Sequence, residues 1–404
     1  MRKYWKTTAI IAVIVLSLGT FYVNSAWSEE QFPEFEIQTV SGNPEEIESL
    51  VLEGSYTDMS YMNYVSSNVK ISAEGSVYNS RSFLNQVIGS YQMVIKELQE
   101  EYRSFMRGKS TWVESYFEND QVLAYAMVED VGPLRSRDFS FEISVLNKGN
   151  NKINSFMVKV PDSKELNYIH VEDVQIIEDD LILITRNNMK SNHNSYGEHY
   201  LYTIDLENQK ISHKESILQF TKSQDNTYTY AQLIESSPTQ ANENLIFQIT
   251  EEKITEDMES TRVEEATHEI VSFNLLSKEK ETLNISDLSL NQTQLSSFDG
   301  TLYHTSIDGQ ELVVTPYHLG ENQADKAFRI QLPSVIGPIY QPIVTVKDGK
   351  FYAASSQMNA DGNMFVIVAD VSTGEKLFSG QVVFKDSLNE KVKFEIYLHQ
   401  LFVK

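Results

Sequence analysis

Oxygen-bearing side chains alternate in the short segment NADGN, which spans residues 359–363. Carboxylate and amide oxygens at alternate positions are typical of the start of a calcium-binding loop. Met364 replaces the glycine that such a loop requires at its sixth position, and an apolar strand follows directly. Because an Asp-Gly-Asn run also builds a hairpin turn without a metal ion, we interpret the segment as a turn. Asn359, Asp361 and Asn363 remain as calcium-ligand candidates.

Histidines form the second set of residues that could carry chemistry. The polar segment 186–199 contains His193 and His199, while His170 and His213 lie outside it. Imidazole nitrogens are common ligands of zinc, copper and iron. A spacing of six residues on a loop fixes no metal geometry, so we interpret the segment as a solvated loop and predict no metal site there.

Signatures of covalent catalysis are weak in this chain. Ser67 and Lys70 match the Ser-x-x-Lys pattern of penicillin-binding enzymes, but they lie on an expected strand and no Ser-Asp-Asn or Lys-Thr-Gly partner follows. The chain has no Gly-x-Ser-x-Gly, no His-Glu-x-x-His and no phosphate-binding loop. It also has no cysteine, which excludes disulfides and thiolate catalysis. The sequence therefore predicts no catalytic residue and favours a protein that is not an enzyme.

A dense acidic stretch runs over residues 251–265. Its simplest interpretation is a long solvated hairpin loop, and the alternative is an interaction arm for a basic partner. The whole chain of 404 residues has a formal net charge of −24, from 57 acidic and 33 basic residues. Such a surface repels nucleic-acid phosphates and anionic lipid headgroups, so we expect neither as a partner.

Two kinds of secondary structure must position these residues. Apolar residues recur at helical spacing over residues 82–106, and Gly108 is a stop signal, so one long helix is expected there. From Thr111 onward, short apolar segments separated by Asp, Asn and Gly indicate strands and turns. The segments 181–184 and 365–369 are apolar on both faces, which is typical of strands that are covered on both sides.

A loose repeat runs through this β region. Each unit opens with an acidic or glycine turn that leads into an apolar strand, as at Asp299-Gly300 and Asp348-Gly349. A second strand then ends in a polar turn, and successive units begin roughly 50 to 65 residues apart, near the blade length of a β-propeller with long loops. We therefore expect an all-β propeller of about six to seven irregular blades over residues 49–404, with the helix at 82–106 inserted or flanking.

One polar turn carries a specific motif. The run ADVSTGEKLF, residues 369–378, places Asp370 before Thr373 and Gly374 and ends in Phe378. It resembles the blade motif of quinoprotein-type (PQQ-repeat or WD40-like) β-propellers, in which tryptophan usually occupies the last position. The resemblance implies a tight turn with glycine at positive φ and an aromatic side chain between blades. We expect no cofactor, because the chain lacks the cysteines that the family's quinone- and calcium-dependent enzymes often have, and it contains only three tryptophans.

The N-terminus combines the features of a membrane anchor. Three basic residues lie within residues 1–6, an uncharged apolar run follows, and Glu29 and Glu30 come after it. Basic residues before the run orient the short segment 1–6 toward the cytoplasm. A helix over residues 7–27 would be about 30 Å long, enough to span a bilayer core, so we expect a single-pass transmembrane helix. The alternative is a cleaved signal peptide, which would give a secreted protein beginning at Glu29.

The segment 28–48 is acidic, contains two prolines, and is expected to tether the extracytoplasmic domain to the anchor. We also expect the C-terminal run 394–403 to share a sheet with one of the early strand-like stretches, 50–53 or 69–73. A propeller has no free edge only if its first and last strands belong to one blade.

Together these features favour a location and a binding role. We expect a protein of the cell membrane, with the bulk of its chain extracytoplasmic, that acts as a scaffold, accessory or sensory factor by contacting an envelope or membrane protein. One alternative is an envelope hydrolase with a dispersed site, which a cluster of perturbed carboxylates or histidines would reveal. A second alternative is a carbohydrate or peptide binder, which surface aromatic residues grouped on one rim would favour.

Overall fold

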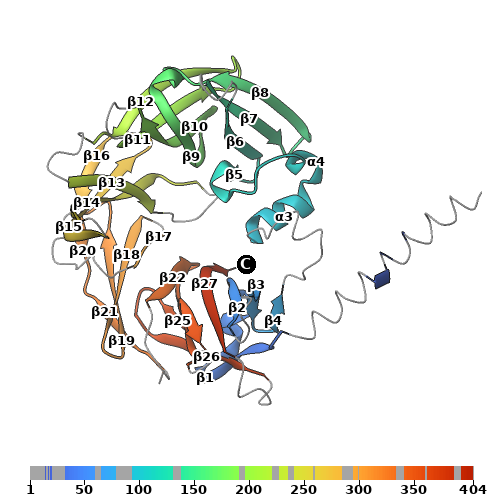
Figure 1. Cartoon of the computed structure of the whole chain (residues 1–404), viewed down its shortest axis with the longest axis vertical. Helices are drawn as coiled ribbons and strands as arrows, with labels where there is room; N and C mark the ends of the chain where they lie inside the picture. Colours follow the sequence, from blue (N-terminus) through green and yellow to red (C-terminus); the bar gives the residue numbers. More distant parts are fainter. Residues whose placement is uncertain are drawn as a thin grey trace, which may run out of the picture. The chain divides into compact units, whose positions relative to one another are not determined.

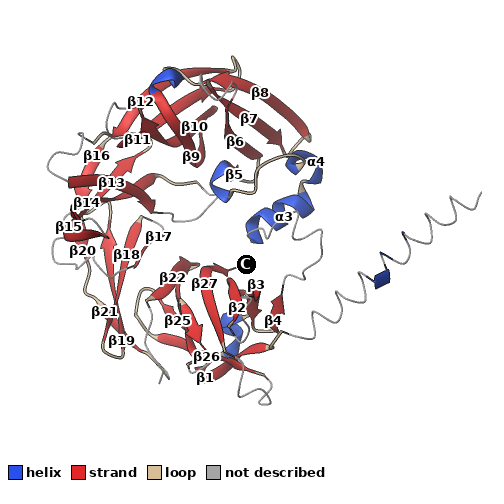
Figure 2. Ribbon diagram, viewed as in Figure 1, coloured by secondary structure: helices blue, strands red, loops and turns tan. Residues whose placement is uncertain are grey.

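The computed structural model describes Ile14, Ser17, Gly19 and Thr20 together with residues 32–59, 65–78, 93–130, 138–190, 196–220, 227–234, 241–257, 260–283, 294–298, 300–333, 341–359, 362–385 and 393–403. Over these residues the chain is all-β, with many strands in small antiparallel sheets and two short α-helices (Figure 2). It divides into two compact units. Unit 1 comprises residues 1–90, 305–314 and 327–404, and unit 2 comprises residues 91–304 and 315–326.

Unit 1 contains two five-stranded antiparallel sheets, with strand orders β1-β26-β25-β23-β22 and β24-β27-β2-β3-β4 (Figure 1). Their strands are β1 (Phe35–Gly42), β2 (Leu50–Asp58), β3 (Val65–Ser72), β4 (Gly75–Tyr78), β22 (Pro342–Lys347), β23 (Lys350–Ser355), β24 (Gln357–Asn359), β25 (Met364–Asp370), β26 (Lys376–Phe384) and β27 (Phe394–Val403). One apolar core, which includes Phe35, Ile71, Val366 and Ile396, draws on both sheets.

The C-terminal strand lies where the sequence predicts it. β27 pairs antiparallel with β2, from Leu50 opposite Val403 to Asp58 opposite Phe394, and β3 lies on the other side of β2. The expected sharing of a sheet between the last strand and an early strand is therefore confirmed. Both early stretches that the sequence singled out belong to this sheet.

β25 shows why a strand can be apolar on both faces. All residues from Met364 to Ala369 are fully buried, because β23 and β26 flank the strand and side chains cover both of its faces. At its end the Asp370 carboxylate accepts hydrogen bonds from the backbone N–H and hydroxyl groups of Ser372 and Thr373. Gly374 has φ of +70° and Phe378 is buried in the core, as the motif implies.

The acidic tether is shorter than expected. From Phe35 onward the segment 28–48 belongs to the fold, because β1 is an edge strand paired with β26 and a 3-10 helix follows at Pro44–Ile47. Phe35 is fully buried, with ring centroids 4.9 Å from Phe384 and 5.6 Å from Phe394. The aromatic side chain of Phe35 therefore ties this part of the segment to the core.

Unit 2 contains three four-stranded antiparallel sheets in which strands consecutive in sequence are neighbours: β5-β6-β7-β8, β9-β10-β11-β12 and β13-β14-β15-β16. The strands are β5 (Tyr116–Glu118), β6 (Val122–Asp130), β7 (Phe139–Asn147), β8 (Lys152–Lys159), β9 (Leu166–Ile177), β10 (Asp180–Met189), β11 (Tyr196–Asp205), β12 (Lys210–Leu218), β13 (Thr227–Ile234), β14 (Asn244–Asp257), β15 (Ser260–Asn274) and β16 (Lys280–Leu283). Short 3-10 helices occur at Val113–Ser115 and Ser163–Glu165.

A sixth sheet is formed by β17 (Gln294–Phe298), β18 (Thr301–Asp308), β19 (Glu311–His318), β20 (Gln323–Ala324) and β21 (Phe328–Gln331). The residues of β18 and β19 are divided between the two units. Within unit 1, β21 pairs with the start of β19, from Glu311 opposite Gln331 to Val314 opposite Phe328.

The helix expected over 82–106 is broken where the structure describes it. α3 covers Met93–Glu101 and α4 covers Arg103–Met106, while residues 82–92 lie outside the described residues. Tyr102 has φ of −115° and ψ of 48°, which is not helical, and this interrupts the expected continuous helix. Ile95, Leu98 and Phe105 are buried on the apolar face, as the spacing predicts.

The described residues of the acidic stretch, 251–257 and 260–265, form paired strands and not a solvated loop. β14 and β15 pair from Asn244 opposite Asn274 to Asp257 opposite Ser260. The expected span at residues 7–27 lies outside the described residues, apart from the four isolated positions named above. Among the residues that the structure describes, no helix has both the length and the apolar character needed to cross a bilayer. The anchor therefore stays a prediction from the sequence.

Candidate functional site

A cavity of about 490 Å³ lies in unit 2. Its lining includes Trp112, Asp130, Tyr168, His170 and Arg186. These residues come from the loop before β5, the end of β6, the edge strand β9 and the neighbouring strand β10. The cavity is therefore built by two consecutive sheets of one unit, and we call it the unit 2 pocket.

Strand geometry places the β9 side chains. Alternate residues of a strand point to opposite faces, and in β9 the residues Ile169 and Val171 are buried while Tyr168 and His170 are not. The pairing register then changes between Ile184 and Thr185 of β10, so that Glu172 has no partner of its own and forms a β-bulge. A bulge re-aims a side chain and is often found next to a functional site.

Two exposed aromatic side chains contact the same imidazole at the pocket. The ring centroids of Trp112 and His170 are 6.0 Å apart at an interplanar angle of 79°, and those of Tyr168 and His170 are 6.3 Å apart at 12°. Trp112 is 58% exposed and Tyr168 is 51% exposed. Side chains this large and apolar are usually more buried, so their shared exposure at a cavity is informative.

A row of polar side chains crosses the same sheet. Arg186 of β10 lies opposite His170 of β9 and opposite His199 of β11. The bulged Glu172 joins two of these residues: its Oε1 atom is 3.3 Å from Nε of Arg186, and its Oε2 atom is 3.0 Å from Nε2 of His199. Arg186 is half exposed, whereas the side chain of Glu172 is largely buried.

His199 is the most buried member of this row. Its side chain is 1% exposed and its ring packs edge-on against Phe247, with centroids 5.1 Å apart. Although Nε2 is close to Glu172, neither imidazole nitrogen has the alignment of a hydrogen bond within the described part of the chain. A buried imidazole without hydrogen bonds is unusual, so the contact with Glu172 is its main polar interaction.

The structure corrects the interpretation of segment 186–199 as a solvated loop. β10 extends to Met189 and β11 begins at Tyr196, so both ends of the segment are paired strands and His199 is buried. His193 lies outside the described residues, and His213 lies on β12, 3.5 Å from a carboxylate oxygen of Glu215. Within the described ranges, no group of three or more His, Asp or Glu side chains could hold a metal ion.

The remaining sequence candidates are not brought to the pocket. Asn359 ends β24 and Asn363 directly precedes β25, both in unit 1, while Asp361 lies outside the described residues. Ser67 and Lys70 lie on β3, as expected for a strand and not for a catalytic helix start. No sequence signal singles out Trp112, Tyr168 or Glu172, because neither the bulge nor the cavity can be recognised from the residue pattern.

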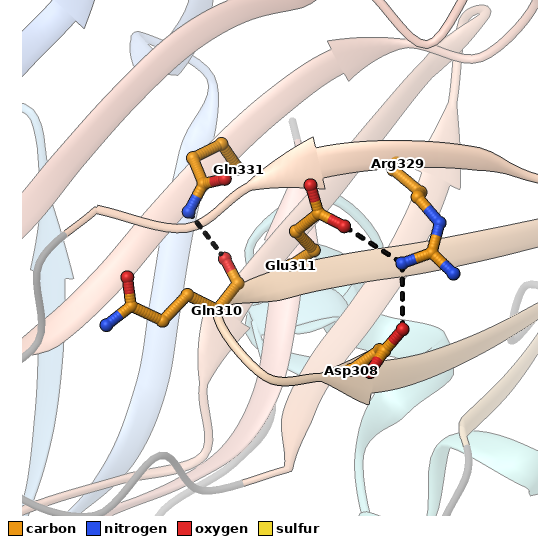
Figure 3. Close-up of polar contacts among 5 residues, drawn as sticks. All are labelled: Asp308, Gln310, Glu311, Arg329 and Gln331. Carbon is orange, nitrogen blue, oxygen red and sulfur yellow. Dashed lines mark hydrogen bonds and ion pairs between the residues drawn. The ribbon is translucent and has the colours of Figure 1, made fainter.

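Unit 1 has a polar cluster of a different kind (Figure 3). Arg329 Nη1 on β21 lies 2.8 Å from Asp308 Oδ2 and 2.9 Å from Glu311 Oε2, and Gln331 donates a hydrogen bond of 3.0 Å to the carbonyl oxygen of Gln310. These contacts join β21 to the turn between β18 and β19. All three charged side chains are at least one-third exposed, so we interpret the cluster as a surface ion-pair network that joins β21 to the hairpin.

No known protein family matches the chain, and no characterised protein is similar to it in sequence. A mutant of Synechocystis apocarotenoid oxygenase is 8% identical, covering 86% of this chain and 92% of that protein, with a TM-score of 0.40. The Dos1 propeller is 8% identical, and the match covers 63% of this chain and 57% of that protein, with a TM-score of 0.29. Kuenenia stuttgartiensis hydrazine synthase is 11% identical, with 49% of this chain covered and a TM-score of 0.27, and the chain spans 50% of its length. Likenesses this low carry no argument about function.

Proposed function

We propose that this protein is a membrane-anchored, extracytoplasmic binding protein of the cell envelope, and that the unit 2 pocket is its ligand-binding site. The observation that carries the proposal is the pair of exposed aromatic side chains, Trp112 and Tyr168, that contact His170 at the cavity. Known small-molecule sites are concave, rich in aromatic side chains and equipped with a few polar groups. The volume of about 490 Å³ lies within the range of such sites.

The location and the architecture belong to the same proposal. Residues 7–27 anchor the chain in the membrane, and the propeller of about six to seven blades holds the pocket outside the cytoplasm. The support for blades is the set of small antiparallel sheets, most with their strands in sequential order, and the pairing of β27 with β2. An anchored binding protein would also serve as the scaffold or accessory factor of an envelope partner.

The carboxylates with clearly shifted pKa values lie outside the lining of the unit 2 pocket. Hydrogen bonds from Lys159 and Ser163 lower the pKa of Asp138, and those from the backbone and side chain of Asn208 lower the pKa of Asp205. Hydrogen bonds from Ser372 and Thr373 lower the pKa of Asp370 to about 2. Each of these shifts is explained by immediate structural neighbours, and none of these three carboxylates lines the pocket.

Capture of envelope material tests the proposal. The full-length protein in lipid nanodiscs should retain envelope components that a Trp112→Ala, Tyr168→Ala double variant does not retain. Tyr397→Ala is the matched control, because Tyr397 is also half exposed but lies on β27 of unit 1. Equal capture by the double variant, at an unchanged melting temperature, would rule out the pocket as the binding site. An intact mass that includes residues 1–28 tests the anchor separately.

A further inference from the structure

We infer that the ligand of the unit 2 pocket is a neutral saccharide, and that Arg186 holds a pair of neighbouring hydroxyl groups on it. The inference rests on the proposed binding function and names the ligand class of the same site. Three observations carry it: the ion pair of Arg186 at Nε, the charge around the guanidinium, and the exposed aromatic rings.

The guanidinium is held from one side. Glu172 Oε1 lies 3.3 Å from Nε of Arg186, and the half-exposed Arg186 side chain lines the cavity. A guanidinium carries five N–H donors in a rigid fork, and an ion pair at Nε leaves the donors of the two terminal nitrogens for other partners. Two neighbouring donors match two neighbouring oxygens, such as those of a carboxylate, a phosphate or a vicinal diol.

Charge decides among these three groups. The carboxylate of Glu172 offsets the positive charge of Arg186, and the acidic residue Asp130 also lines the cavity. The whole chain adds a net charge of −24, which repels anions approaching from solution. A diol carries no charge, and its hydroxyl groups both donate and accept, so it can bond to the guanidinium and to a carboxylate at once. The arrangement therefore suits hydroxyl groups better than a carboxylate or a phosphate.

The aromatic rim suits the rest of a sugar ring. A pyranose has C–H groups on its faces as well as hydroxyl groups at its edge, and such an apolar face stacks on an aromatic side chain. Trp112 and Tyr168 offer ring surface of this kind, since each is more than half exposed at the cavity. Burial of an aromatic ring also contributes more binding free energy than burial of most other side chains, because the ring has a large area.

Glu172 is the positioning residue of this site. It occupies a β-bulge, so its side chain is not set by the regular alternation of β9, and it bridges Arg186 and the buried His199. Its side chain is 13% exposed, so it is largely shielded from bulk solvent. We expect Glu172 to fix the direction of the fork and to keep the pocket from attracting anions.

The test is a titration of the full-length protein in lipid nanodiscs, which avoids detergents that carry sugar headgroups. The probes are neutral gluco-, manno-, galacto- and chito-hexasaccharides, a hexagalacturonate, and a proline-rich peptide of similar length. Trp112 is the only tryptophan outside the N-terminal segment, so its fluorescence reports on the pocket against a background from Trp5 and Trp27. We expect at least one neutral hexasaccharide to bind saturably and more tightly than the uronate or the peptide.

Two variants separate recognition from packing. Arg186→Lys should weaken neutral saccharide binding about tenfold, because a single ammonium replaces the fork. Glu172→Gln should weaken binding of the neutral saccharide and raise the affinity for hexagalacturonate relative to the affinity for the neutral saccharide. Loosened packing alone would not produce this change of selectivity. Arg329→Lys, which alters an exposed arginine paired with two carboxylates in unit 1, is the matched control and should change neither affinity.

The outcomes distinguish the two proposals. If no neutral hexasaccharide binds while capture of envelope material still depends on Trp112 and Tyr168, the saccharide inference is wrong and the binding function stands. Tighter binding of the uronate or the peptide by the wild-type protein would also overturn the inference. If capture does not depend on the two aromatic residues, both proposals fail. An unchanged uronate preference in Glu172→Gln would remove the positioning role of Glu172.

Discussion

Leu50, the first residue of β2, lies opposite Val403, the last residue of β27. The two strands stay paired to Asp58 and Phe394, with a register shift after Glu53. An early segment and the C-terminal segment of the chain therefore depend on each other for a common core in unit 1. This relationship has direct consequences for stability.

Deletion of residues 395–404 should unfold or severely destabilise unit 1. The deletion removes Ile396, Leu398, Leu401 and Val403, all buried, and at about 1.5 to 3 kcal/mol each their burial amounts to about 6 to 12 kcal/mol. That loss is comparable to the whole stability of an ordinary domain. Thermal melting followed by circular dichroism measures the effect. A truncated protein that melts at the temperature of the full chain would show that β27 is merely an appended strand.

A matched pair of point variants on β27 separates burial from pairing. Ile396→Ala should cost about 2 to 5 kcal/mol of unfolding free energy, because Ile396 is fully buried in the unit 1 core. The neighbouring residue Tyr397 is 50% exposed, so Tyr397→Ala should cost about 0.5 kcal/mol of unfolding free energy or less. Urea titration of both variants provides the comparison. Similar losses would mean that the two faces of β27 are not buried as described.

Two glycines with nearly the same backbone conformation should respond differently to alanine. Gly349 has φ of +72°, and no atom of the described part of the chain lies within 4 Å of an added Cβ, so Gly349→Ala should cost about 1 to 2 kcal/mol from backbone strain alone. Gly374 has φ of +70°, but an added Cβ would lie 2.7 Å from the Phe328 side chain. Gly374→Ala should therefore cost at least about 1 kcal/mol more, as measured by chemical denaturation. Equal costs would argue against close packing of Phe328 on this turn.

The turn after β25 should make stability depend on pH in acid. Hydrogen bonds from Ser372 and Thr373 lower the pKa of Asp370 to about 2, from an ordinary value of 3.8. The stabilisation by the ionised carboxylate is therefore complete above about pH 4 and is lost as the pH falls toward about 2. In Asp370→Asn the side-chain oxygen can still accept hydrogen bonds, but it no longer ionises. The difference in unfolding free energy between wild type and variant should shrink over this pH range, and a constant difference would contradict the shifted pKa.

Much of the strand architecture could be predicted from the sequence. The continuous apolar run of β25 and the Asp-x-x-Thr-Gly turn after it depend on local patterns, and the structure shows both. The C-terminal strand could be placed because an unpaired apolar strand at a chain end needs an early partner. The tether was predicted too long, since composition alone did not reveal that Phe35 anchors β1 to the core.

The candidate site could not be predicted, for physical reasons that the residues make clear. Cross-strand register brings His170, Arg186 and His199 into one row, and a bulge adds Glu172. Register and bulges depend on the pairing of whole strands, so the spacing of these residues in sequence carries no trace of them. Trp112 lies on a loop before β5, and only the fold places it against His170.

Footprinting shows whether the unit 2 pocket is covered when the protein binds its ligand. Hydroxyl-radical footprinting of the full-length protein in nanodiscs, with and without solubilised envelope extract, measures the side-chain oxidation of Trp112 and Tyr168. We expect the extract to protect both residues and to leave Tyr397, which is half exposed in unit 1, at its original rate of oxidation. Unchanged oxidation of Trp112 and Tyr168, or equal protection of Tyr397, would contradict the assignment of the pocket as the ligand-binding site.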